Sequence, residues 1–169
     1  MSRAFVKDDA DDGQVVIPPR TAIPPGVANY VTPRGLGLLR AELLELESER
    51  GRIKSVQNRN DSDRARNVAI NRGQIQQLEA RIASSRLVDP AAQPASEVRF
   101  GARVTLELGA ESRVVKIVGV DESDASLGLI GFLAPIARSL TGKKLGDEVM
   151  WPTPAGSKGF RIVGIEYGE

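Results

Sequence analysis

Two arms of regularly spaced apolar residues, separated by one turn-forming cluster, limit the possible folds of this chain more than any other feature. In each arm of residues 33–86 the apolar residues recur at alternating steps of three and four, which is typical of the narrow seam of a coiled coil. The seam positions are Leu36, Leu39, Leu43, Leu46 and Ile53 in the first arm and Val68, Ile75, Leu78 and Ile82 in the second. Turn-forming residues cluster between the arms only at 58–63. The pattern therefore predicts an antiparallel helical hairpin.

Local signals place the start of this hairpin and suggest its size. Thr32 followed by Pro33 favours a helix start, with the hydroxyl at the N-cap and the proline at the first helical position. Gly35, Gly37 and Gly51 should weaken the first arm by up to about 1 kcal/mol each relative to alanine. An arm of about 25 residues forms a rod of roughly 35–40 Å, which we expect to project from the rest of the protein.

The segment before the hairpin differs from it in composition. Residues 1–29 contain an acidic cluster and two Pro-Pro pairs, with few residues to bury. This composition predicts a flexible leader, and the alternative is a short strand or a docking segment at residues 15–17. The hairpin itself is expected to occupy residues 30–88.

After the hairpin, a linker of small residues at 89–97 leads into a segment with a different period. From residue 98 to residue 169 the apolar residues tend to alternate, which predicts five short strands, and residues 135–140 read as a short helix. We therefore expect an α+β protein, with the helical hairpin followed by a small domain built on an antiparallel sheet.

Charge is balanced over the whole chain but not along it. The formal net charge is +1, so bulk charge identifies no partner. The outer half of the hairpin is basic, with Arg50, Arg52, Lys54, Arg59, Arg64, Arg66 and Arg72. These residues could contact RNA phosphate, or they could form an ordinary solvated helix surface.

Missing residue types exclude several kinds of chemistry. The chain has no cysteine and no histidine, which excludes disulfides, cysteine nucleophiles, zinc sites that need these ligands and histidine acid–base catalysis. No apolar run approaches the ~18 residues that span a bilayer, and the N-terminus lacks the apolar core of a signal peptide. We expect a soluble cytoplasmic protein that does not bind membranes.

Several local motifs resemble those of one known family. They are the helix start at residues 32–35, the hairpin end at 88–90, the strand entry at 100–106 and the segments 134–143 and 146–149. Together they are similar to the GreA/GreB family of bacterial transcript-cleavage factors, over residues 30–167. The resemblance implies that the C-terminal domain is FKBP-like.

The resemblance also implies a mechanism and a partner. In that family the C-terminal domain docks at the rim of the secondary channel of bacterial RNA polymerase, and here the docking edge would be Ala134, Pro135, Ile136, Ala137 and Arg138. The alternative is that this segment is an ordinary strand-to-helix turn. The coiled coil enters the channel and approaches the 3′ end of the nascent RNA. Its tip carboxylates help to hold the second catalytic Mg²⁺ of the polymerase, which then hydrolyses backtracked RNA. Such a factor is not itself an enzyme and has no cofactor of its own, and we expect it to be monomeric.

Asp61 and Asp63 are the candidates for these tip carboxylates. They could instead be a turn residue and the N-cap of the second arm. The family tip carries an Asp and a Glu, whereas this one has no Glu and is flanked by Arg59, Arg64 and Arg66. The hairpin is also shorter by roughly one to two turns per arm, or about 5–10 Å. Two outcomes follow: stimulated RNA cleavage, or occupation of the channel without cleavage, in which the basic tip hinders nucleotide entry or holds RNA.

Two readings from other classes remain as alternatives. An FKBP-like domain could be a peptidyl-prolyl isomerase, but fold alone is weak support for an activity. The pocket of such an enzyme needs clustered aromatics, and the C-terminal aromatics are few and placed mainly in strands: Phe100, Phe132, Trp151, Phe160 and Tyr167. The chain could also be an adaptor that pairs its coil with another protein, although the two matching arms favour pairing within the chain.

Overall fold

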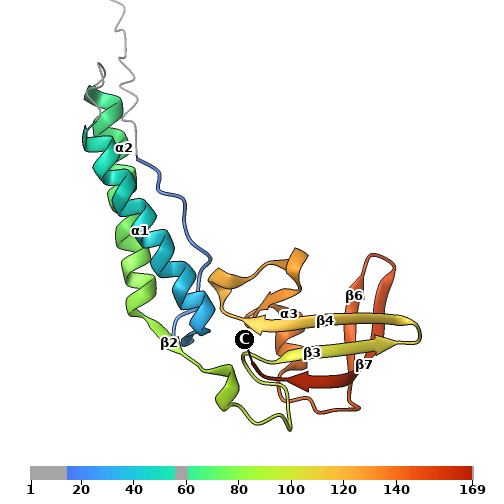
Figure 1. The fold of residues 1–169 in the computed structure, drawn as a ribbon. Coiled ribbons are helices and arrows are strands. Elements are labelled where there is room, and N and C mark those ends of the chain that lie inside the picture. Colours follow the sequence, from blue (N-terminus) through green and yellow to red (C-terminus); the bar gives the residue numbers. More distant parts are fainter. Residues whose placement is uncertain (1–14, 56–60, 169) are drawn as a thin grey trace, which may run out of the picture.

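A helical hairpin stands out from a small sheet domain (Figure 1). The computed structural model describes residues 15–55 and 61–168. The hairpin consists of α1 (Pro33–Ser55) and α2 (Asp61–Ala83). Helix α2 begins inside the cluster predicted as a turn, because Asp61 and Asp63 already belong to its first turn.

The predicted seam holds the two helices together. Leu39 and Leu78 are buried between them, and Leu36, Leu43, Leu46 and Ile82 pack against that pair. Asn71 fills a gap in the second stripe and is also buried, with its Nδ2 donating a hydrogen bond of 2.9 Å to the carbonyl oxygen of Leu46. The predicted stripe is therefore confirmed at these leucines and at Ile82, and the polar residue that interrupts it makes a hydrogen bond between the helices.

A small parallel sheet closes the base of the hairpin, and the sequence analysis did not anticipate it. Strand β1 (Asn29–Val31) precedes α1, and β2 (Ser85–Leu87) follows α2. Their register pairs Asn29 with Ser85 and Val31 with Leu87. At the start of α1, Thr32 Oγ1 accepts a hydrogen bond of 2.9 Å from the Gly35 N–H, which confirms the predicted cap.

The C-terminal domain is a curled five-stranded sheet with a short helix. Its elements are β3 (Arg103–Leu108), β4 (Glu111–Val118), β5 (Leu129–Gly131), α3 (Pro135–Leu140), β6 (Glu148–Thr153) and β7 (Gly156–Glu166). The strand order is β5-β4-β3-β7-β6. The core contains Phe160, Leu106, Ile117 and Ile162, with Leu140 contributed by α3.

The sheet is antiparallel, as predicted, except at one edge. Strand β5 runs parallel to β4. Two 3-10 turns, η2 (Val120–Glu122) and η3 (Ala125–Leu127), carry the chain back before β5 begins. The chain therefore enters β5 in the same direction as β4.

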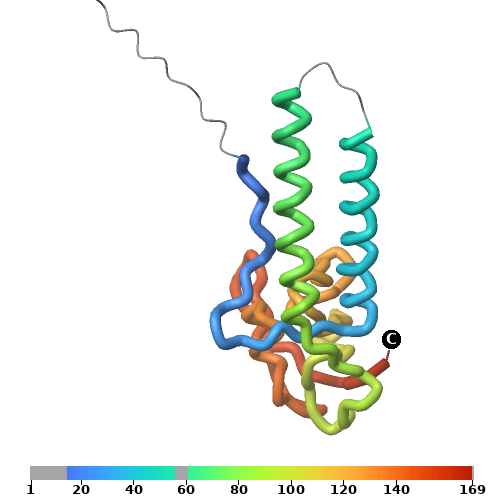
Figure 2. Tube along the Cα trace, turned by 90° about the vertical axis from the view of Figure 1, so that its left-hand side faces the viewer, coloured from blue at the N-terminus to red at the C-terminus, as the bar shows by residue number. Residues whose placement is uncertain are grey.

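Residues 15–28 run beside α2 without helix or strand, with one turn at residues 25–26 (Figure 2). This course differs from the flexible leader predicted from the sequence, because Arg20 and Ile17 contact other parts of the molecule. Residues 1–14 of that leader lie outside the described residues. Within the predicted linker, Pro90–Ala92 form a 3-10 turn, η1, capped by Asp89.

Candidate functional site

The tip carboxylates lie in the first turn of α2. Asp61 and Asp63 are both exposed. Carboxylates in the first turn of a helix are stabilised by its unpaired amides and its dipole. Residues two apart on an α-helix point about 200° away from each other around its axis, so these two side chains leave the helix on different sides. No cluster of acidic residues suited to a metal ion is present in residues 15–55 and 61–168.

The basic residues of the tip are only partly free for a ligand. Arg64 Nη2 donates a hydrogen bond of 2.8 Å to the carbonyl oxygen of Lys54, which connects the two arms near the tip. Arg66 is exposed. Arg59, the third predicted basic tip residue, lies outside the described residues.

The predicted docking edge is less accessible than its sequence suggested. Ala137 is fully buried in the core of the C-terminal domain, so its side chain cannot contact a partner. Ala134 and Ile136 are half-buried and pack against the same core. Pro135 and Arg138 are exposed. Helix α3 has only six residues, so with Ala137 buried it can present only the opposite face to a partner.

Beside this edge, three aromatic rings meet at the base of the hairpin. Tyr30 of β1 lies 5.7 Å from Phe100 and 5.7 Å from Phe132 between ring centroids, and the latter two are 5.8 Å apart. The rings line a hollow of about 590 Å³, and Arg99 and Arg138 also line it. The prediction that the C-terminal aromatics lie mainly in strands was wrong for Phe100 and Phe132, which lie in turns. Tyr30 completes the cluster from a strand that the sequence did not reveal.

Buried polar contacts join the start of α1 to the C-terminal domain. Glu122 of η2 accepts hydrogen bonds from Thr32 Oγ1 at 2.5 Å and from Arg34 Nη1 at 2.8 Å, and its side chain is 3% exposed. A Cβ atom at Gly35 would lie 2.7 Å from Glu122 Oε2, so glycine is needed for this close approach. The sequence indicated the α1 side of this contact through the helix start at residues 32–35. No sequence pattern indicated Glu122.

A second set of charges lies at the same joint. Arg20 reaches Glu42 of α1 and Asp121 of η2, and the hydrogen bond with Glu42 raises the pKa of the Arg20 guanidinium above its usual value. Arg81 of α2 also pairs with Asp121, with 3.3 Å between Nε and Oδ2. Sequence reasoning missed these residues because they lie far apart along the chain.

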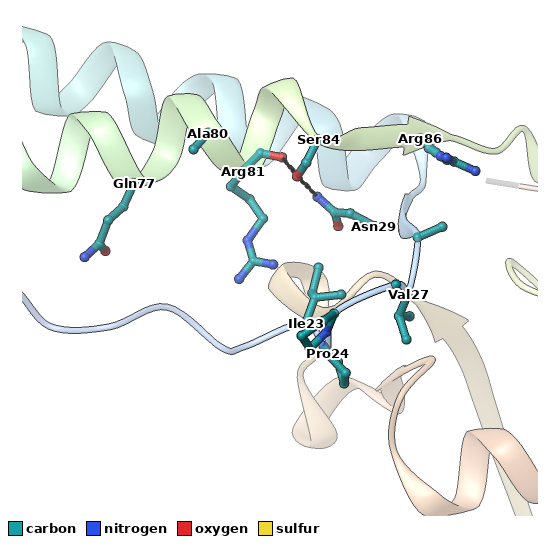
Figure 3. A pocket seen from close by; sticks show the side chains of 12 residues that line it. Ile23, Pro24, Val27, Asn29, Gln77, Ala80, Arg81, Ser84 and Arg86 are labelled. Atoms are coloured by element: carbon teal, nitrogen blue, oxygen red, sulfur yellow. Dashed lines mark hydrogen bonds between the residues drawn. The ribbon is translucent and has the colours of Figure 1, made fainter.

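A further hollow of about 510 Å³ separates residues 23–29 from the end of α2 (Figure 3). On one side of it Asn29 Nδ2 donates to the Arg81 carbonyl at 3.0 Å and to Ser84 Oγ at 3.1 Å. Figure 3 shows the Arg81 side chain extending from α2 toward the segment that contains Ile23. The entry of the hairpin is thus tied to its exit by side-chain contacts as well as by the β1–β2 pair.

Comparisons with known proteins found a family model, curated relatives and solved structures that match the chain. The family model described as "Transcription elongation factor, GreA/GreB, C-term" matches residues 93–167. A transcription elongation factor GreA of Jannaschia sp. (strain CCS1) is 37% identical over 151 residues, covering 81% of this chain and 96% of the relative. Another, of Ruegeria pomeroyi, is 36% identical with the same coverage. A solved GreA/GreB structure from Nitrosomonas europaea is 24% identical, covers 83% of this chain and 99% of that chain, and has a TM-score of 0.42.

The sequence matches to the two GreA relatives extend beyond the C-terminal domain. The alignment with the Jannaschia relative covers 81% of this chain, more than the sheet domain alone could provide. The family model independently matches the C-terminal domain. The chain therefore belongs to the GreA/GreB family of transcription elongation factors.

Proposed function

We propose that this chain regulates transcription elongation by binding bacterial RNA polymerase and inserting its hairpin into the secondary channel. The observation that carries the proposal is the narrow hairpin that projects from a compact domain (Figure 1). Each helix has 23 residues, which corresponds to a rod of roughly 35 Å. A rod with one apolar seam and an outer surface that is polar apart from exposed Leu38 and Leu44 can enter a water-filled channel without exposing its core.

Docking at the channel rim would use the accessible part of the predicted edge. Pro135 and Arg138 are exposed, and Arg138 borders the apolar hollow formed by Tyr30, Phe100 and Phe132. An apolar surface with a cationic margin suits a partner surface that combines apolar and acidic side chains. Ala137 supports this edge from within the core.

At the tip, Asp61 and Asp63 are the carboxylates that would approach the Mg²⁺ of the polymerase. Carboxylate oxygens are the ligands this ion prefers. Because the two side chains leave α2 on different sides, we propose that one of them faces the ion and the other stabilises the start of the helix. Arg66, which is exposed, would lie close to the phosphates of the RNA 3′ end.

The chain acts on the active centre of its partner and is not itself an enzyme. A Gre-type factor supplies groups that complete a reaction centre within the polymerase. We expect this chain in the cytoplasm, because transcription occurs there. A peptidyl-prolyl isomerase is not favoured, because the family is defined by transcription elongation. No helix in the described part of the chain is long and apolar enough to cross a membrane.

Two assays test this proposal. Core RNA polymerase should retain the chain in a pull-down at low salt, and an absence of binding would exclude the proposal. A backtracked elongation complex with Mg²⁺ should then lose RNA from the 3′ end faster when the chain is added. If the RNA stays intact while elongation slows, the chain occupies the channel without stimulating cleavage.

The same assay separates the roles of the two carboxylates. Asp61→Asn and Asp63→Asn are tested singly, with Glu47→Gln, an exposed acid on α1, as the matched control. One tip variant should lower the cleavage rate by about tenfold or more, as loss of a ligand or water-positioning group does. Cleavage that survives both substitutions combined would contradict the assignment to this tip.

A further inference from the structure

Residues 15–28 contact α1, α2 and the η2 turn of the C-terminal domain. Apart from this segment, the hairpin and the C-terminal domain are joined, in the described part of the chain, only at the base of the hairpin. The segment passes along α2 and reaches the joint between the hairpin and the C-terminal domain before β1 begins (Figures 1 and 2). Pro18 to Thr21 line one side of a hollow whose other walls come from α1, α2 and η2. We call residues 15–28 the strap.

Arg20 is the main polar contact of the strap. Its guanidinium donates to both carboxylate oxygens of Glu42, at 2.7 and 3.1 Å, and to Asp121 Oδ1 at 3.0 and 3.3 Å. Glu42 belongs to α1 and Asp121 to η2 of the C-terminal domain. A planar guanidinium that binds one carboxylate with a pair of hydrogen bonds fixes direction as well as distance. Arg20 therefore links the hairpin to the C-terminal domain through the strap.

Arg81 connects the same carboxylate to the second helix. It pairs with Asp121, and its Nη2 donates a hydrogen bond to the carbonyl oxygen of Thr21 in the strap. The side chains of Arg81 and Asp121 are each 10% exposed, and that of Arg20 is 23% exposed. The Arg81–Asp121 pair is well shielded from water, so it interacts more strongly than a surface pair and loss of one charge leaves the other poorly solvated. Glu42, the other partner of Arg20, is 44% exposed.

Nearer the tip of the hairpin, the strap packs against α2 at a glycine. Gly73 is buried, and a Cβ atom there would lie 1.9 Å from Ile17 Cδ1 and 2.9 Å from Ile17 Cγ1. Glycine in a helix interior costs up to about 1 kcal/mol relative to alanine. At Gly73 the absence of a side chain leaves the space that Ile17 occupies. By contrast, Gly37 and Gly51 of α1 have nothing within 4 Å of an added Cβ.

We propose that the strap sets the angle between the hairpin and the C-terminal domain, with Arg20 as its positioning residue and Gly73 as the seat for Ile17. The Glu122 contacts hold the first turn of α1 against η2, close to the pivot. Arg20 binds Glu42, two helical turns farther along α1, so it restrains the hairpin with a longer lever arm. Release of the strap should leave each part folded but let the hairpin swing.

The test measures the strap and the joint separately on the free full-length chain. Because the chain has no cysteine, pairs of spin labels can be placed without background. Ala22→Cys with Gln76→Cys reports the distance from the strap to α2, and Ser48→Cys with Ser112→Cys reports the distance from α1 to β4. All four positions are exposed. The unsubstituted background should give one narrow distance distribution for each pair.

The double variant Arg20→Gln with Gly73→Ala removes the ion pairs of the strap and the seat of Ile17, and it leaves the hydrogen bond from Arg81 to the Thr21 carbonyl. We expect the narrow peak to be lost for the strap pair and for the joint pair, with the circular dichroism of the helices retained. The matched control is Arg40→Gln with Gly51→Ala, which makes the same two changes at exposed positions of α1 and should leave both peaks narrow.

Two results would overturn the proposal. A narrow strap peak in the double variant would show that Arg20 and Gly73 do not hold the strap, and a broad strap peak with an unchanged joint peak would show that the strap does not set the angle. Neither readout involves RNA polymerase, so the outcome is independent of the proposed function.

Discussion

At the scale of single residues, Tyr167 connects the end of the chain to the start of the C-terminal domain. Its hydroxyl accepts a hydrogen bond of 2.8 Å from the Arg99 N–H and donates one of 2.6 Å to the Glu97 carbonyl. Burial raises the pKa of Tyr167 above its usual 10.0. The phenol is therefore more stable in its neutral form in the folded protein than in the unfolded chain.

Tyr167→Phe should lower the free energy of unfolding by about 1–2 kcal/mol at neutral pH, because two backbone groups lose their partner. For a raised pKa, the linked stability is present below the unfolded pKa of about 10 and is lost as the pH rises through the folded pKa. Urea denaturation between pH 8 and pH 11 checks both points. An unchanged free energy of unfolding at pH 8, or an equal decline of both proteins above pH 10, would contradict this role.

Thr32 has two hydrogen-bonding roles at the start of α1. Thr32→Val removes the cap on the Gly35 N–H and a donor to buried Glu122, so it should destabilise the protein by about 1–3 kcal/mol. Thr32→Ser keeps the hydroxyl and serves as the control. If the Thr32→Val and Thr32→Ser variants have the same denaturation midpoint, the Thr32 hydroxyl does not stabilise the start of α1. The cap could be predicted from neighbouring residues, whereas Glu122 could not, because it lies 90 positions away.

At the scale of elements, the glycines of α1 are not equivalent, although the sequence analysis treated them alike. Gly37→Ala and Gly51→Ala place a methyl group in open space and should each stabilise the protein by up to about 1 kcal/mol. Gly35→Ala should destabilise it, because the new Cβ would meet Glu122 Oε2. Thermal denaturation followed by circular dichroism ranks the three variants. Stabilisation by Gly35→Ala would show that the contact with Glu122 is not tight.

Elements with a long or regular pattern could be predicted from the sequence. The hairpin followed from the spacing of Leu39, Leu78 and their neighbours, and β3 and β4 followed from apolar alternation. Strands β1 and β2 could not be predicted, because each has three residues and their pairing joins segments more than 50 positions apart. The parallel placement of β5 depends on the η2 and η3 turns, which have no distinctive pattern. The tertiary contacts of residues 15–28 were missed because proline-rich composition indicates only the lack of regular structure.

At the scale of the whole molecule, the orientation of the hairpin depends on side chains from distant parts of the chain. Arg20, Glu42, Arg81 and Asp121 come from the strap, both helices and the C-terminal domain. None of their pairings is visible in local sequence. The candidate site shows the same division. The resemblance to the GreA/GreB family made Asp61 and Asp63 candidates, but their divergence around α2 appears only once the start of the helix is known.

If the strap sets this orientation, its release should also alter transcription. The variant Arg20→Gln with Gly73→Ala should reduce the effect on a backtracked complex by about tenfold, because a swinging hairpin spends less time in the inserted orientation. Arg40→Gln with Gly51→Ala should keep the full effect. Equal activity of the two variants would mean that binding to the polymerase imposes the orientation without help from the strap.

The most direct measurement concerns where the tip of the hairpin lies in the complex. Ser62, exposed in the first turn of α2, can be replaced by the only cysteine of the chain and linked to an iron chelate that generates hydroxyl radicals. In a complex with RNA polymerase, the chelate should cut the RNA near its 3′ end and the polymerase segments around the catalytic Mg²⁺. Cuts confined to the outer surface of a polymerase that binds the chain would contradict insertion of the hairpin.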